Sequence, residues 1–363
     1  MKKNKNYVDL KDQPVPEGQH LLEVDDLKMY FHTEDGVVRA VDGVSYTLDR
    51  GETLAVVGES GSGKSVTAMT IMGLISMPPG KIEGGDVRYR GRSILEMTEE
   101  EMQHIRGNDI AMIFQDPMTS LNPVYKIGKQ VGEGLRLHRG YSKQEALKRA
   151  TELLDLVGIP EPEKRVNEYP HQFSGGMRQR VMIAMALACD PDILIADEPT
   201  TALDVTIQAQ IIELMQEMQE KNGNAIIMIT HDLGVVADMA DKIMVMYAGR
   251  PVEFGTAEEI FYESRHPYTW GLIRSIPEQA IDEKKPLTPI HGNPPSLMNL
   301  PEGCVFSPRC PYATDKCRKQ RPERVVTDSG HYSACHYSGD PEFLKNAPET
   351  SRTRKDSKKG GEA

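Results

Sequence analysis

The stretch from Gly58 to Ser65 has the composition of a loop that binds a polyphosphate. It reads Gly-Glu-Ser-Gly-Ser-Gly-Lys-Ser, follows the apolar run 54–57 and leads into the apolar segment 66–75. This order predicts a strand, a glycine loop and a helix, so that backbone N–H groups and a helix N-terminus face the phosphates. We expect Lys64 to reach the β- and γ-phosphates and Ser65 to bind Mg²⁺. The nucleotide-binding residues predicted here are Gly58, Ser60, Gly61, Ser62, Gly63, Lys64 and Ser65.

Two carboxylates end another apolar run. They supply acidic groups for Mg²⁺ and for the attacking water, which phosphoryl transfer needs in addition to the glycine loop. Asp197 and Glu198 follow the run 193–196, which predicts a buried strand. One carboxylate can hold Mg²⁺ beside Ser65, and the next can orient the water that attacks the γ-phosphate. We assign Asp197 to the metal and Glu198 to the water. The alternative is a helix cap or a solvated strand end, which the glycine loop in the same chain disfavours.

Composition limits the possible functions. The net charge of −11 and the isoelectric point near 5.5 argue against a broad nucleic-acid surface, so no nucleic-acid partner is expected. No apolar run approaches the length of a membrane span, and the first residues lack the apolar core of a signal peptide. We therefore expect a cytosolic protein.

Four of the five cysteines lie close together in the C-terminal part of the chain. Cys304, Cys310, Cys317 and Cys335 have the spacing C-x5-C-x6-C-x17-C. A cytosolic location disfavours disulfides, which leaves Zn²⁺ or an iron–sulfur cluster held by thiolates. The close cysteine pairs of the usual zinc sites are missing. His331 and His336 are further candidate ligands, whereas Cys189 lies in an apolar run and is expected to be buried.

Strands and helices alternate along most of the chain, which indicates an α/β fold. Residues 1–20 are polar and are expected to form a loose lead. Alternating patterns over 21–31 and 37–48 predict an antiparallel hairpin layer. Further strands are expected at 82–91, 110–114, 193–198, 225–230, 242–247 and 251–254. Helices are expected at 98–106, 142–156, 177–189 and 206–220. A proline-rich, loop-rich unit covers 265–340, and disorder is expected over the tail 341–363.

The motifs and their order resemble the nucleotide-binding subunits of ABC transporters. The resemblance covers 21–264 and rests on the glycine loop, Gln115, Ser174-Gly175-Gly176-Met177, the strand ending at Glu198, Thr201-Ala-Leu-Asp204 and His231. Segments 115–123, 169–180 and 266–268 look like the D-type ATPase subunits of the oligopeptide/dipeptide importer branch. The resemblance implies a P-loop NTPase domain with an antiparallel β layer and a helical subdomain at about 95–185, followed by a small cysteine-containing unit.

The resemblance also implies roles for residues whose types alone are uninformative. Ser174, Gly175 and Gly176 would contact the γ-phosphate of ATP held by a partner subunit, although by themselves they form a helix-entry turn. By the same resemblance, Gln115 would approach Mg²⁺ and the attacking water, Asp204 would link the two sites of a dimer, and His231 would bind the γ-phosphate. Phe31 matches the aromatic that stacks on adenine, with Tyr30 as its neighbour. Met177 departs from the glutamine that is usual in the family.

The partners and cofactors implied by the resemblance define a transporter subunit. They are ATP, Mg²⁺, a second homologous ATPase subunit, two transmembrane permease subunits and an external peptide-binding protein, with the chain at the cytoplasmic face of the membrane. For the four cysteines the branch implies a [4Fe-4S] cluster, with Zn²⁺ as the alternative. The expected function is ATP-driven oligopeptide import. Dipeptide or nickel import, a soluble ABC ATPase without a transport role and an ATP-regulated binding module are the alternatives.

Overall fold

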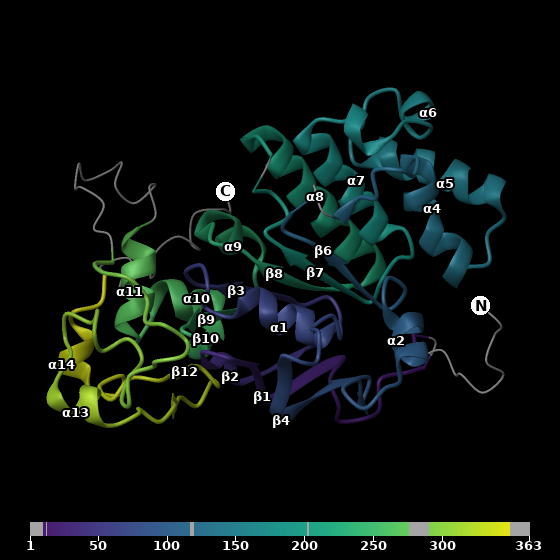
Figure 1. Ribbon diagram of the computed structural model, residues 1–363. Helices are drawn as coiled ribbons and strands as arrows, with labels where there is room; N and C mark the ends of the chain where they lie inside the picture. Colours follow the sequence, from purple (N-terminus) through teal and green to yellow (C-terminus); the bar gives the residue numbers. More distant parts are fainter. Residues whose placement is uncertain (1–9, 12, 117–119, 202, 276–289, 349–363) are drawn as a thin grey trace.

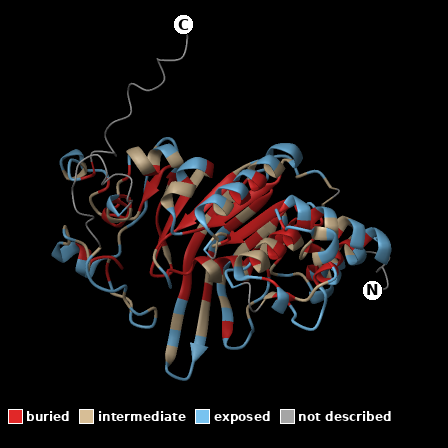
Figure 2. Cartoon of the chain, turned by 90° about the horizontal axis from the view of Figure 1, so that it is seen from above, coloured by how far each residue is buried: buried red, intermediate tan, exposed pale blue. Residues whose placement is uncertain are grey.

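The computed structural model describes residues 10, 11, 13–116, 120–201, 203–275 and 290–348. Its elements form two sheets, a helical part and a loop-rich C-terminal unit (Figure 1). Figure 2 shows the buried residues concentrated on the strands of the larger sheet, whereas the helices also carry exposed and partly buried residues. No helix within these described ranges is long and apolar enough to cross a membrane.

The smaller sheet is the antiparallel layer predicted from the alternating patterns. It has the order β2-β1-β4-β5, and β1 pairs with β2 from Leu22 opposite Leu48 to Thr33 opposite Gly36. Its strands are β1 (Leu22–Thr33), β2 (Gly36–Leu48), β4 (Gly80–Tyr89) and β5 (Arg92–Ser93). Apolar side chains of β1 and β2 alternate with polar ones, so one face of this sheet packs on the core.

The larger sheet positions the predicted chemistry. Its order is β11-β12-β10-β9-β3-β8-β7-β6, and the pairs β9-β3, β3-β8, β8-β7 and β7-β6 are parallel. The strands are β3 (Thr53–Val57), β6 (Ile110–Ile113), β7 (Ile193–Asp197), β8 (Ala225–Ile229), β9 (Lys242–Tyr247), β10 (Arg250–Thr256), β11 (Val325–Val326) and β12 (Tyr332–Ser333). Parallel neighbours end at one edge, so the residues that follow β3, β6, β7 and β8 meet there.

Helices cover this sheet and build the helical part. The helices up to β10 are α1 (Lys64–Ile71), α2 (Glu99–Ile105), α4 (Ile127–His138), α5 (Lys143–Leu156), α6 (Pro162–Arg165), η1 (Pro170–Gln172), α7 (Gly175–Leu187), α8 (Val205–Asn222) and α9 (Leu233–Met239). Helices α2 and α5 begin close to their predicted starts, where Thr98 and Ser142 each form a capping box with the glutamate three residues on. Helix α7 begins at Gly175, two residues before the predicted start, because the Ser174 hydroxyl accepts the Met177 N–H.

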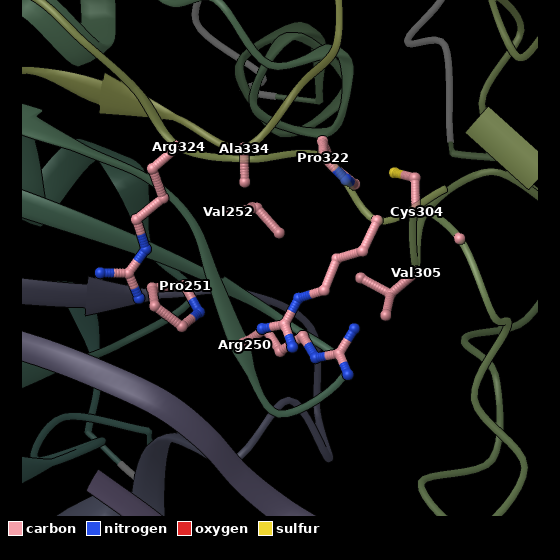
Figure 3. A pocket seen from close by; sticks show the side chains of 10 residues that line it. Arg250, Pro251, Val252, Cys304, Val305, Pro322, Arg324 and Ala334 are labelled. Atoms are coloured by element: carbon pink, nitrogen blue, oxygen red, sulfur yellow. The ribbon is translucent and has the colours of Figure 1, made fainter. Parts of the chain in front are cut away.

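The C-terminal unit, residues 265–348, is mostly loop. Its helices are α11 (Pro267–Arg274), α13 (Asp315–Lys319) and α14 (Pro341–Leu344), after α10 (Ala257–Tyr262). Strand β12 pairs with β10, and the buried Glu253 and His331 side chains lie 3.0 Å apart across that seam. The pocket in Figure 3 lies at the same seam and is lined by Arg250, Pro251 and Val252 of β10 and by Cys304, Val305, Pro322, Arg324 and Ala334 of the unit.

Both ends of the described chain pack against the domain. Leu10 is buried in the core, and the Lys11 ammonium donates to the carbonyl oxygens of Asn108 and Cys189. At the other end, Phe343 of α14 lies against Trp270, with ring centroids 5.3 Å apart. Part of the expected loose lead and the first residues of the expected tail are therefore anchored, whereas residues 1–9, 12 and 349–363 lie outside the described residues.

A buried ion pair joins the two sheets. Asp192, just before β7, accepts hydrogen bonds from the Tyr89 hydroxyl at 2.6 Å and from the Arg90 guanidinium at 2.5 Å. Tyr89 ends β4 of the antiparallel sheet, so these bonds connect that sheet to the larger one. Burial opposes the charge, but the bonds from Tyr89 and Arg90 outweigh it and hold the pKa of Asp192 below its ordinary value.

Asp192→Asn should destabilise the fold by about 3 kcal/mol, because it leaves the Arg90 guanidinium buried without its anion. Since the pKa of Asp192 is lowered, this cost is present at neutral pH and disappears as the solution is acidified through that lowered pKa. Denaturant unfolding at several pH values measures it. Glu152→Gln, which removes one charge from an exposed pair with Arg149, is the control and should change stability by less than about 0.5 kcal/mol.

Candidate functional site

Close packing imposes the glycines of the phosphate loop. Gly58 has φ +150°, and a Cβ there would lie 2.2 Å from the Met246 carbonyl oxygen. Gly63, the N-cap of α1, has φ +100°, and its Cβ would lie 2.3 Å from the Ala40 carbonyl oxygen. Gly61 also has a positive φ but stands in open space. The loop is therefore pressed against β9 and β2, and only residues without a Cβ fit at its two ends.

Lys64 is buried inside the loop. Its ammonium donates to the carbonyl oxygens of Gly58 at 2.7 Å and of Glu59 at 3.0 Å, and the Ser62 hydroxyl lies 3.5 Å away. Burial lowers the pKa of Lys64, and the carboxylates of Glu198, Asp197 and Glu59 oppose that shift. The lysine is thus a buried cation whose partners are neutral carbonyl oxygens, and a phosphate anion would bind it more strongly. Ser60, by contrast, is exposed on the outer side of the loop.

Ser65 and Asp197 come together as predicted for a metal site. The Ser65 hydroxyl donates to the Asp197 carboxylate at 3.0 Å, across 132 residues of sequence. Burial and the neighbouring Glu198 raise the pKa of Asp197, while Ser65 and Lys64 act in the opposite direction. A hydroxyl and a carboxylate side by side are oxygen donors of the kind that Mg²⁺ prefers, and a bound cation would relieve the unfavourable carboxylate charge.

Glu198 lies where the ends of three neighbouring strands meet. Its carboxylate accepts from the Gln115 amide at 3.0 Å and from the Thr201 hydroxyl at 3.1 Å, and His231 Nδ1 is 3.5 Å away. Its backbone has φ +48°, and its N–H donates to the Ile229 carbonyl. The structure therefore brings Gln115, Asp197, Glu198 and His231 to one edge beside the loop.

Sequence reasoning did not single out two residues that support Glu198. Thr201 belongs to the quoted Thr-Ala-Leu-Asp motif, yet it received no role of its own. Gln179, fully buried in α7, donates its amide to the Pro199 carbonyl and lies 3.5 Å from that of Glu198. In the sequence Gln179 stands between Arg178 and Arg180, so no local pattern marks it as a buried residue.

Other predicted residues lie apart from this cluster. The Ser174 hydroxyl caps its own helix and, like Gly175, is exposed, while Gly176 is partly exposed. Asp204 is exposed and caps α8 by accepting the Ile207 N–H at 3.0 Å. On β1, the Tyr30 hydroxyl donates to Asp42, whereas Phe31 is partly buried beside the core.

The four C-terminal cysteines line one pocket. Cys304, Cys310, Cys317 and Cys335 share it with aromatic residues, among them Phe306 and Tyr337. Burial raises the pKa of Cys310 to about 11 and of Cys335 to about 12, while backbone N–H groups of Tyr312 and Tyr337 favour the thiolates. Among the described residues, no three Cys, His, Asp or Glu side chains are grouped tightly enough to hold a metal ion. The donors fit a thiolate site, but the positions of the sulfur atoms do not by themselves define one.

Two residues of the C-terminal unit contact the phosphate loop, which the sequence did not predict. The Tyr268 hydroxyl accepts the Glu59 N–H at 2.8 Å. The Arg309 guanidinium binds both Glu59 carboxylate oxygens, at 2.5 and 2.9 Å. The cysteine pattern drew attention to Cys310 and not to its neighbour Arg309.

The sequence matches two family models. The model for "ABC transporter" covers residues 41–201, and the model for "Oligopeptide/dipeptide transporter, C-terminal region" covers residues 252–317. The first contains the phosphate loop, Gln115 and Glu198, and the second reaches from β10 to Cys317.

Similar proteins cover most of the chain. An oligopeptide transport ATP-binding protein of Bacillus subtilis is 58% identical over 86% of this chain and 87% of its own length. A dipeptide transport ATP-binding protein of Escherichia coli is 52% identical over 87% of this chain and 96% of its own. A solved ATP-binding cassette, dimeric in a post-hydrolysis state with ADP and phosphate, has a TM-score of 0.60 at 29% identity and covers 65% of this chain and 98% of that chain. The predicted fold class is confirmed.

Asp197→Asn should stabilise the protein in the absence of metal while abolishing Mg²⁺-dependent ATP hydrolysis. The raised pKa means that the ionised carboxylate opposes folding at neutral pH, and a neutral amide can still accept the Ser65 hydrogen bond. We expect a gain of about 1 kcal/mol in denaturant unfolding with EDTA present. Glu213→Gln on the exposed face of α8 is the control. A loss of stability in Asp197→Asn would contradict this account of the site.

Proposed function

The chain belongs to the family of ATP-binding subunits of ABC transporters for oligopeptides and dipeptides, and we propose that it is the ATP-hydrolysing subunit of an oligopeptide importer. One observation carries this proposal: the phosphate loop, two carboxylates, Gln115 and His231 meet at one edge of the sheet, in a chain that also matches the C-terminal region of this branch.

The proposed chemistry is positioning and charge neutralisation. The ATP phosphates replace the carbonyl oxygens that the Lys64 ammonium contacts, and Ser65 and Asp197 would hold Mg²⁺, which would neutralise phosphate charge. Glu198 orients the attacking water and accepts its proton, because its carboxylate is already fixed by Gln115 and Thr201. His231 donates to the γ-phosphate. Phe31, partly exposed on β1, stacks on the adenine.

We infer that the complete site needs a second ATPase subunit. Ser174, Gly175 and Gly176 are open at the start of α7, where backbone N–H groups can bind the phosphates on the partner. Asp204 is open at the start of α8 and would link the two sites. ATP then closes two nucleotide domains and hydrolysis reopens them. A homologous but distinct subunit, two permease subunits and an external peptide-binding protein complete the proposed transporter at the cytoplasmic face of the membrane.

We also propose that Cys304, Cys310, Cys317 and Cys335 hold a [4Fe-4S] cluster with a structural role, with Zn²⁺ as the alternative. The support is the shared pocket and the backbone N–H groups that face three of the sulfur atoms. A cation would remove the cost of burying the thiolates.

Glu198→Gln should bind ATP with an affinity close to that of the parent but reduce hydrolysis by about a hundredfold or more, because the amide cannot accept the proton of water. Equilibrium ATP binding and steady-state phosphate release measure the two effects. Glu213→Gln again serves as the matched control. Near-normal hydrolysis by Glu198→Gln would remove Glu198 from its proposed role.

The substrate is tested in cells whose only copy of the gene encodes Glu198→Gln. We expect uptake of a labelled pentapeptide to be lost. If dipeptide or Ni²⁺ uptake is lost and pentapeptide uptake is unchanged, the ATPase assignment stands and the assignment of oligopeptides as substrates is wrong. Dipeptides are the second candidate, since the Escherichia coli relative is a dipeptide transport protein.

Anaerobic purification should give a brown protein with about four iron and four sulfide ions per chain, as expected for one [4Fe-4S] cluster. Iron and sulfide analysis measures both. Cys335→Ser should lower the iron content, whereas Cys189→Ser, outside the pocket, should not change it. A colourless protein loaded with zinc would refute the cluster.

A further inference from the structure

The Arg309 side chain crosses from the cysteine-rich unit to the phosphate loop. It is only 4% exposed, and its five N–H groups have five acceptors. Two are the Glu59 carboxylate oxygens, and the others are the carbonyl oxygens of Ile290 and His291 and the Tyr247 hydroxyl. A guanidinium held at all five donors is fixed in position and orientation, so it can fix the carboxylate that it contacts.

Glu59 is restrained through three of its groups. Its carboxylate binds Arg309, its backbone N–H donates to the Tyr268 hydroxyl, and its carbonyl oxygen accepts from the Lys64 ammonium. The first two partners come from the C-terminal unit, and the third is the lysine that we expect to bind the phosphates. The conformation at the start of the loop is therefore set by residues more than 200 positions further along the chain.

The segment that carries Arg309 is packed rigidly. The Arg309 and Cys310 N–H groups both donate to the Phe306 carbonyl at 3.0 Å. The Phe306 ring is buried, with centroids 5.3 Å from Tyr268 and 5.2 Å from Tyr247. One tight turn thus places Arg309 next to Cys310 of the cysteine pocket and against Tyr247 at the end of β9.

The charges give this contact a consequence for ATP binding. Glu59 lies next to Lys64, because its carbonyl oxygen accepts from the Lys64 ammonium at 3.0 Å. Without Arg309 the Glu59 carboxylate would be an unpaired anion beside the site of the phosphates, where it repels them and competes for the Lys64 ammonium.

We propose that Arg309 is a positioning residue of the ATP site, which holds the Glu59 carboxylate away from Lys64 and thereby makes ATP affinity depend on the folded cysteine-rich unit. The inference rests on the proposed function only in that ATP binds to the loop from Gly58 to Ser65. The C-terminal unit then has a role in the nucleotide-binding site of its own chain.

The test is equilibrium binding of a fluorescent ATP analogue to the full chain, with EDTA present to prevent hydrolysis. Arg309→Met should weaken binding about tenfold, the scale of one charge-assisted hydrogen bond. Adding Glu59→Gln to Arg309→Met should recover at least half of the lost affinity on a logarithmic scale, because it removes the freed anion. Arg318→Met, an exposed arginine of the same unit, is the control and should bind like the parent.

The rescue separates positioning from a purely structural role. If Arg309 only stabilised the C-terminal unit, Glu59→Gln would not restore binding, and that result would overturn the proposal. Unchanged affinity in Arg309→Met would also overturn it. Should Arg309→Met fail to fold by near-ultraviolet circular dichroism, Arg309→Lys, which keeps the charge without the fork, should bind about threefold more weakly and be rescued by the same Glu59→Gln change.

Lys64→Ala distinguishes this inference from the proposed function. If the parent binds the analogue and Lys64→Ala does not, the loop is the binding site. If the parent fails to bind, or Lys64→Ala binds equally well, the proposed ATP site and this inference fall together. If the parent binds normally and Arg309→Met binds as tightly, the inference about Arg309 is wrong and the proposed ATP site stands.

Discussion

Burial of the Lys64 ammonium is the constraint on which the site depends. A buried cation needs partners, and in this structure they are two carbonyl oxygens of its own loop, with three carboxylates nearby. Those carbonyl oxygens can reach the lysine only because the loop turns tightly at Gly58 and Gly63, which press against β9 and β2. The strand, loop and helix are therefore organised around a charge that a polyphosphate can satisfy better than the protein does.

The two ends of β7 show how the fold separates stability from function. Asp192 precedes the strand and Asp197 ends it, and both carboxylates are buried. Tyr89 and Arg90 outweigh burial and lower the pKa of Asp192. At Asp197, burial and the neighbouring Glu198 outweigh Ser65 and Lys64, so its pKa is raised. The first aspartate holds the two sheets together, while the second retains an unfavourable charge that a metal ion can neutralise.

The C-terminal unit is connected to this site as well as to the edge of the sheet. Strand β12 extends β10, and the buried contact between Glu253 and His331 closes the seam. Beyond that seam, Tyr268 and Arg309 bind the main chain and side chain of Glu59. A unit that contacts the phosphate loop in this way is part of the structure that prepares the loop for ATP.

The sequence alone determined the features that consecutive residues encode. The phosphate loop was recognised because its spacing and conformational needs lie within eight neighbouring residues, and the helix caps at Thr98 and Ser142 depend on partners three residues away. Tertiary structure alone decided which groups meet: Asp197 with Ser65, Gln115 with Glu198, and Arg309 with Glu59, 250 positions apart. Such contacts leave no periodicity in the sequence, because they arise only when the parallel strands end at a common edge and the C-terminal unit folds back against it.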